Sequence, residues 1–91
     1  MDSREAQETG GGTATAVCSR ETLVTFVGEI VQEWGAAPSN WTNQTAGEFV
    51  EALAAWLADM DGYYARFGTT ADVVSPWRVI ADAIAAARFY E

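Results

Sequence analysis

The sequence contains no histidine, no lysine and only one cysteine, and these absences exclude several kinds of chemistry. Without histidine, no imidazole is present to act as a general base, to activate a serine or to bind a metal. Without lysine, neither a Schiff base nor the lysine of a phosphate-binding loop is available. Cys18 has no second cysteine for an internal disulfide and no evident base beside it. We therefore expect no catalytic residue, no metal site and no cofactor.

Positive charge is also scarce. Five arginines stand against thirteen acidic residues, so the formal net charge is −8. Proteins bind DNA and RNA largely by neutralising phosphates with Lys and Arg, so this composition argues against a nucleic-acid partner. The same charge would attract a basic protein, although net negative charge also serves simply to keep a small protein soluble.

No run of apolar residues is long enough to span a bilayer. The opening residues, MDSREAQETGGG, lack the basic and apolar regions of a signal peptide, so we expect a cytoplasmic protein with no membrane partner. Residues 1–17 are polar, small and glycine-rich, which predicts a disordered acidic tail. With 91 residues in all, residues 18–91 are expected to form a single helical domain.

Three segments repeat apolar residues at the spacing of a helix face. The first covers about residues 20–34, with Ser19 as its N-cap. Its apolar face is formed by Leu23, Phe26, Val27, Ile30, Val31 and Trp34. The opposite face is expected to hold Glu29, Gln32 and Glu33. Gly35 and Pro38 end this helix, and Trp41 in the following connection is expected to pack on the core.

The second segment, Phe49 to Tyr64, is expected to be the element around which the chain is organised. Thr45 and Glu48 have the spacing of a capping box, which fixes the start of a helix. Its apolar face is formed by Phe49, Leu53, Trp56, Leu57 and Met60. Gly62 is suited to end a helix, so the predicted helix covers about residues 46–61. A short helical turn would follow, formed by Tyr63, Tyr64 and Phe67.

The third helix starts at Ser75 and Pro76, with serine as the N-cap and proline at the first helical position. Apolar residues follow at helical spacing up to Tyr90, and the alanines among them allow neighbouring helices to approach closely. Only residues 13–18 and 73–74 could hide a short strand. The sequence thus predicts an all-α fold, a small three-helix bundle with an extra short helical turn and a flexible N-terminal tail.

Acidic residues stand near the predicted end of the second helix. Asp59 and Asp61 with Gly62 resemble the opening of a calcium-binding loop, but tyrosines follow where a ligand and a glycine are needed, and Thr70 replaces the bidentate glutamate. Two acids at a helix C-terminus also oppose the helix dipole. Recognition by a partner would offset that cost, and so would pairing with an arginine. The candidates for pairing are Arg66, Arg78 and Arg88.

Tyrosine, tryptophan and arginine are frequent in interface hot spots, and here they accompany these acids. The candidate partner-binding residues are Trp41, Asp59, Asp61, Tyr63, Tyr64, Trp77, Arg78 and Tyr90. The same aromatic residues also close the core of a small domain, and packing in the core is the more frequent role of such residues.

The leading hypothesis is a non-enzymatic, acidic protein-interaction module. In one concrete version it is an immunity or antitoxin-like inhibitor that covers the basic site of its partner. The alternative is a small-ligand-binding or enzymatic domain that uses Asp59, Asp61 and the adjacent tyrosines, which requires these groups to share a pocket. A third hypothesis is a homodimer, which an exposed apolar patch around Trp41 or Trp77 would favour.

Several short strings resemble an uncharacterised family of small acidic bacterial proteins, a domain of unknown function. The strings are Trp41-Thr42-Asn43-Gln44-Thr45, Glu51-Ala52-Leu53-Ala54-Ala55-Trp56, Asp59-Met60-Asp61-Gly62-Tyr63-Tyr64, Trp77-Arg78, Ala81-Asp82 and Ala86-Ala87-Arg88-Phe89-Tyr90-Glu91. The likeness covers roughly the last two thirds of the chain and leaves out the glycine-rich tail. It implies a bacterial, non-secreted protein, and it implies no particular activity or site.

Overall fold

The computed structural model describes residues 14–90, and every regular element in that range is a helix. The elements in chain order are the 3-10 turn η1 (Ala14–Ala16), α1 (Arg20–Ala36), the 3-10 turn η2 (Pro38–Asn40), α2 (Ala46–Ala65) and α3 (Pro76–Ala87). Neither residues 14–18 nor residues 73–74 form a strand. The predicted all-α fold with three helices is therefore confirmed. None of the helices in the described range combines the length and apolar character needed to cross a membrane.

Local sequence signals set the start of each helix as predicted. Ser19 caps α1 through a capping box. At the start of α2, the Thr45 hydroxyl accepts from the Glu48 backbone N–H at 3.1 Å, and the Glu48 carboxylate accepts from the Thr45 N–H at 3.1 Å. The Ser75 hydroxyl accepts from the backbone N–H of Trp77 at 3.2 Å at the start of α3. These bonds satisfy N–H groups that the first turn of a helix leaves without a partner.

The end of α2 lies beyond the predicted position. Gly62 stays within the helix, which continues to Ala65. The glycine that adopts a left-handed conformation is Gly68, with a φ of +71°. The prediction that Gly62 ends the helix is wrong because Tyr63 and Tyr64 are held in the second core cluster, so packing carries the helix past the glycine.

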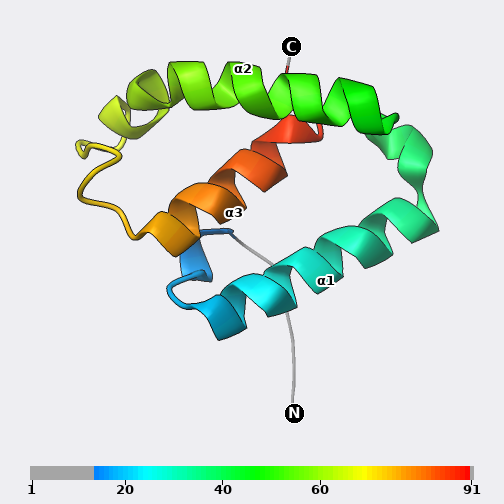
Figure 1. Ribbon diagram of the computed structural model, residues 1–91, viewed down its shortest axis with the longest axis horizontal. Coiled ribbons are helices and arrows are strands. Elements are labelled where there is room, and N and C mark those ends of the chain that lie inside the picture. Colours follow the sequence, from blue (N-terminus) through cyan, green and yellow to red (C-terminus); the bar gives the residue numbers. More distant parts are fainter. Residues whose placement is uncertain (1–13, 91) are drawn as a thin grey trace.

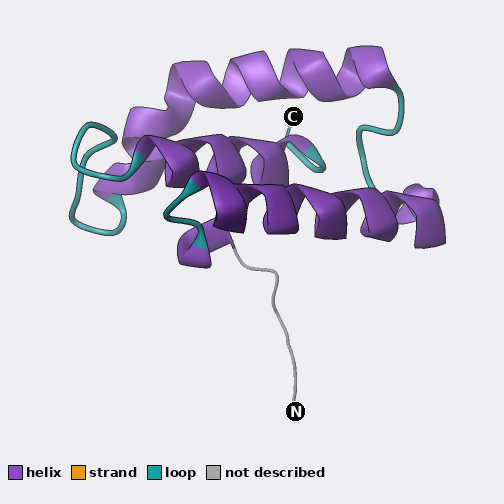
Figure 2. Ribbon diagram, turned by 60° about the horizontal axis from the view of Figure 1, so that its bottom comes forward, coloured by secondary structure: helices purple, strands orange, loops and turns teal. Residues whose placement is uncertain are grey.

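The centre of the fold is α3 and not the segment Phe49 to Tyr64. In both views α3 lies between α1 and α2 (Figures 1 and 2), and it packs on α1, α2 and η1. This position suits its sequence, because small side chains allow close approach from several sides. Its buried alanines are Ala81, Ala83 and Ala87. The prediction that α2 organises the chain is therefore wrong, since α1 and α2 are joined mainly through α3.

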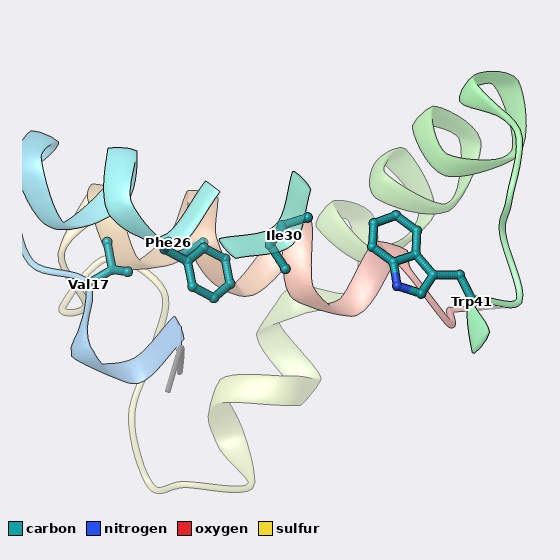
Figure 3. Packing of buried hydrophobic residues seen from close by; sticks show 5 residues of the cluster. Val17, Phe26, Ile30 and Trp41 are labelled. Carbon is teal, nitrogen blue, oxygen red and sulfur yellow. The ribbon is translucent and has the colours of Figure 1, made fainter. Parts of the chain in front are cut away.

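The core consists of two clusters that both include residues of α3. The first is formed by Val17, Phe26, Ile30, Trp41 and Ala81. Figure 3 shows its larger side chains in a row, with Val17 at one end and Trp41 at the other. The second cluster, formed by Trp56, Tyr64 and Ala83, lies between α2 and α3. Because both clusters rest on α3, this short helix links the two halves of the core.

The folded part of the chain begins earlier than predicted. Residues 1–13 of the predicted tail lie outside the described residues. The rest of that segment is ordered, because η1 packs on α3 and Val17 is only 3% exposed. The predicted boundary after residue 17 is therefore wrong for residues 14–17. A single valine among small residues has no periodicity, so its burial depends on a contact that the local sequence does not reveal.

Candidate functional site

The eight residues expected to bind a partner lie in different parts of the fold. Three line one surface hollow, namely Asp59, Tyr63 and Tyr90. Two are buried in the core, namely Trp41 and Tyr64. The other three lie outside this hollow, namely Asp61, Trp77 and Arg78. The structure thus brings three of the eight predicted residues together in one hollow, and the other five lie elsewhere in the fold.

Tyr64 belongs to a buried polar contact between α2 and α3. It is fully buried, and its hydroxyl donates to Asp82 Oδ2 at 2.7 Å. Asp82 is 4% exposed and also accepts from Arg78 Nε at 3.3 Å, so its charge is paired. Burial, together with the bond to Asp82, raises the pKa of the Tyr64 hydroxyl above its usual range. Tyr64 offers no surface to a partner, and its predicted role in binding is wrong.

Glu33 makes a second polar contact, which joins α1 to the end of α3. Arg88 Nη1 donates to both carboxylate oxygens of Glu33 at 2.8 Å, and the indole Nε1 of Trp41 donates to Glu33 Oε2 at 2.7 Å. The prediction that Glu33 faces away from the core is therefore wrong. Trp41 is 6% exposed, and its ring lies 5.2 Å from that of Trp34 and 5.7 Å from that of Phe49. Its predicted packing on the core is confirmed.

The hollow beside α2 has a volume of about 580 Å³. Its lining residues are Trp56, Asp59, Gly62, Tyr63, Arg66, Ala86 and Tyr90. The Tyr90 hydroxyl donates to Asp59 Oδ2, and this hydrogen bond raises the pKa of Tyr90. The ring of Tyr63 meets that of Trp56 edge-on, with the ring centroids 5.4 Å apart. A carboxylate therefore stands beside a wall of aromatic rings.

A second hollow, of about 380 Å³, adjoins the first at Tyr90, which lines both. Its lining residues are Asn43, Glu48, Glu51, Ala52, Ala55 and Tyr90. The Asn43 side-chain amide donates to the backbone carbonyls of Ala87 at 2.9 Å and Tyr90 at 2.8 Å. These two bonds fix the residues after α3 against the start of α2. We call the residues that line the two hollows the α2 groove.

Negative charge predominates in the α2 groove. Its ionisable acids are Glu48, Glu51 and Asp59, and its one guanidinium is Arg66. Backbone N–H groups before α2 hold the pKa of Glu48 below its usual value, so this carboxyl is charged at neutral pH. Glu48, Glu51, Asp59 and the C-cap residue Arg66 follow one another at spacings of three, eight and seven residues, each close to a whole number of helical turns. All four side chains therefore lie on one side of α2. The groove thus presents a line of carboxylates along the helix, which ends at an arginine.

Asp59 and Asp61 do not form a pair. Residues two apart on a helix point to different sides, and Asp61 is exposed, lines neither hollow and has no ion pair with another described residue. Both acids lie within α2, so they cannot wrap around a cation as a calcium loop does. In residues 14–90 no three His, Cys, Asp or Glu side chains are grouped as metal ligands.

Pairing with an arginine is one of the two explanations that the sequence leaves open for these acids, and no ion pair of this kind is present among the described residues. Asp59 is bound by Tyr90, whereas Arg78 binds Asp82 and Arg88 binds Glu33. The expected dipole cost is also smaller than the sequence suggests, because α2 continues past both acids to Ala65.

Together the fold and the groove define a small acidic all-α domain with a line of carboxylates and tyrosines beside one helix. Over residues 19–91 the sequence matches the DUF7660 family, described as a family of unknown function. The chain therefore belongs to this family, and its resemblance to an uncharacterised domain is confirmed. No curated protein and no solved structure matches the chain.

Proposed function

We propose that this protein is a non-enzymatic interaction module that uses the α2 groove to bind a basic segment of a partner protein. The observation that carries the proposal is the alignment of Glu48, Glu51 and Asp59 on one side of α2, beside tyrosine rings. The field of a protein with a net charge of −8 attracts a basic partner. The tyrosines add the large, rigid contact area that is typical of interface hot spots.

In the most concrete form of the proposal, the protein is an immunity or antitoxin-like inhibitor in the bacterial cytoplasm. Its carboxylates cover a basic site on the partner, in place of the nucleic acid or other anion that this site normally binds. Charge complementarity of this kind gives fast association and specificity.

The enzymatic alternative has less support. It requires Asp59, Asp61 and the neighbouring tyrosines in one pocket, but Asp61 lies outside the hollow and Tyr64 is buried. No imidazole, amine or thiol lines the α2 groove, and the one carboxylate–hydroxyl pair, Asp59 with Tyr90, is already joined by a hydrogen bond. The α2 groove is therefore better suited to binding a partner than to catalysis.

Self-association is supported by a different surface. A mainly apolar hollow of about 360 Å³ lies where the end of α1 meets the start of α2. Trp34 is 37% exposed there and Val50 is 62% exposed. A homodimer formed through these side chains would persist at high salt, since burial of apolar surface is not screened by ions.

Affinity capture from a lysate of the host bacterium, at low and at high salt, tests the proposed function. Wild type is compared with Glu51→Gln and with Asp61→Asn, because each variant removes one exposed charge from α2 and only Glu51 lines the groove. We expect a basic protein that is captured at low salt, lost at high salt and weakened more by Glu51→Gln than by Asp61→Asn. Capture that is indifferent to salt, equal losses in the two variants, or no captured protein would contradict the proposal.

A further inference from the structure

We infer that the hollow between Asp59 and Arg66 seats a single arginine side chain of the partner. This inference rests on the proposed function and adds which side chain docks and where. Asp59 uses Oδ2 to accept from Tyr90, while Oδ1 has no hydrogen-bond partner among the described residues. A carboxylate has about four acceptor positions, so Asp59 retains the capacity to bind a guanidinium while Tyr90 holds its side chain in place.

The walls of the hollow suit the flat faces of a guanidinium. Trp56 is only 4% exposed, so the accessible rings are those of Tyr63 and Tyr90. Arginine stacks on aromatic faces as well as pairing with carboxylates, whereas lysine is a compact and strongly hydrated point charge. Tyr90 is held by Asp59 at its hydroxyl and by Asn43 at its carbonyl. The ring is therefore positioned before the partner arrives, which lowers the entropy cost of binding.

Gly62 leaves the hollow open between the two charged residues. It lies three residues after Asp59 and four before Arg66, on the same side of α2. A Cβ added at Gly62 would meet no atom within 4 Å, so the packing of the fold does not require a glycine there. A larger side chain at this position would fill the space above the helix that a docked side chain needs.

The charges of the α2 groove select a cation. In the hollow itself Asp59 is the one carboxylate beside Arg66, and Glu48 and Glu51 add two more carboxylates in the adjoining hollow. Arg66 has no ion pair with another described residue. The guanidinium of Arg66 opposes a bound arginine, so it lowers the affinity of the hollow without reversing its preference. Removing this one positive charge should therefore strengthen binding of a cation.

A titration of the 15N-labelled full chain with Nα-acetyl-arginine methylamide, followed by NMR, tests this site. The leucine and glutamate analogues serve as controls. We expect the arginine compound alone to shift the amide signals of Gly62, Tyr63 and Tyr90. Asp59→Asn, which keeps an acceptor for the Tyr90 hydroxyl, should weaken binding about fivefold, the range of an exposed ion pair. Arg66→Gln should strengthen binding.

The matched pair Gly62→Leu and Gly28→Leu tests the position of the arginine. Both glycines lie within long helices, and a Cβ at either meets no atom within 4 Å. Only Gly62→Leu should abolish the shifts. The inference is overturned if both variants bind equally, if Asp59→Asn has no effect, or if the glutamate compound shifts the same residues in an Arg66-dependent way.

The outcomes of this titration and of affinity capture separate the inference from the proposed function. Salt-dependent capture that is weakened by Glu51→Gln, without any binding of the arginine compound, would overturn the arginine site and leave the interaction module standing. Binding of the arginine compound at Asp59 without any captured protein would support the site and contradict the interaction module.

Discussion

At the scale of single residues, α3 is fixed to its neighbours by side-chain polar contacts that reach across the sequence. Tyr64 binds Asp82 between α2 and α3, and Arg88 binds Glu33 between the end of α3 and α1. The Arg78–Asp82 spacing of four residues is a local sign that Asp82 is paired, but nothing local indicates that Tyr64 reaches it. The Glu33–Arg88 pair joins residues 55 positions apart. Such contacts depend on the packed fold, so the sequence did not predict them.

Tyr64→Phe should lower the free energy of unfolding by about 1.5–3 kcal/mol at neutral pH. The variant loses a hydrogen bond to a charged group and leaves the buried Asp82 carboxylate with Arg78 as its remaining partner. Urea unfolding followed by circular dichroism would measure the difference. A loss below about 0.5 kcal/mol, as at an ordinary surface site, would contradict the role assigned to this bond.

The same pair of proteins should show a defined pH dependence. The pKa of Tyr64 is raised in the folded state, so its contribution is complete below its unfolded pKa of about 10 and is lost as the pH rises above it. The stability advantage of wild type over Tyr64→Phe should therefore narrow above a pH of about 10. Urea unfolding at neutral and alkaline pH measures the difference in free energy of unfolding between the two proteins. A difference that does not change with pH would show that the Tyr64 hydroxyl has the same pKa in the folded and unfolded states.

Glu33→Ala should lower the free energy of unfolding by about 1–2 kcal/mol, because Arg88 and the Trp41 indole both lose their acceptor. Both charged side chains of the pair are partly exposed, so solvent screening keeps the loss modest. Glu29→Ala is the matched control, since Glu29 is an exposed glutamate of the same helix and should change stability by less than about 0.5 kcal/mol. If Glu33→Ala and Glu29→Ala changed stability equally in thermal unfolding, the contacts of Glu33 with Arg88 and Trp41 would not stabilise the fold.

At the scale of the elements, helix starts were predictable and the end of α2 was not. Capping at Ser19, Thr45 and Ser75 is a matter of residues within one turn, which the sequence displays directly. The end of α2 depends on Tyr63 and Tyr64 packing in the second core cluster. A glycine in a helix therefore marks the end of that helix only where packing does not continue beyond it.

Two glycines of this region should respond oppositely to alanine. Gly62→Ala should raise the free energy of unfolding by about 0.5–1 kcal/mol, because Gly62 lies within α2 and an added Cβ meets no atom. Gly68→Ala should lower it by about 1–2 kcal/mol, because the φ of +71° is unfavourable for a residue with a Cβ. Thermal unfolding of the two variants shows whether each substitution raises or lowers the free energy of unfolding. If Gly62→Ala destabilised the protein and Gly68→Ala stabilised it, α2 would end at Gly62.

At the scale of the whole molecule, the candidate site was predicted only in part. Residue type alone predicts Asp59, Tyr63 and Tyr90 as partner-binding residues, and the structure brings these three together in one hollow. Residue type does not single out Glu51 and Arg66, because their place in the α2 groove depends on where the end of α3 rests. The sequence also predicts the core incompletely, because it places Val17 in the tail. Val17 lies before the segment that the family match covers, yet it packs in the first core cluster.

Val17→Ala should lower the free energy of unfolding by about 1–2.5 kcal/mol, because it removes two buried methyl groups and leaves space between η1 and α3. Val24→Ala removes the same groups from a side chain that is 65% exposed, so it should cost less than about 0.5 kcal/mol. Urea unfolding of both variants would decide whether residues before the family match belong to the core. Equal and small effects would place Val17 outside it.

The α2 groove is the surface that we propose meets the partner. The most direct measurement is an NMR titration of the 15N-labelled chain at low salt with the basic protein obtained by affinity capture. We expect amide shifts along the groove side of α2, from Glu48 to Arg66, and at Tyr90, with little change at Val24 and Val31 on the exposed side of α1. Shifts centred on these valines, with the groove unchanged, would contradict the claim.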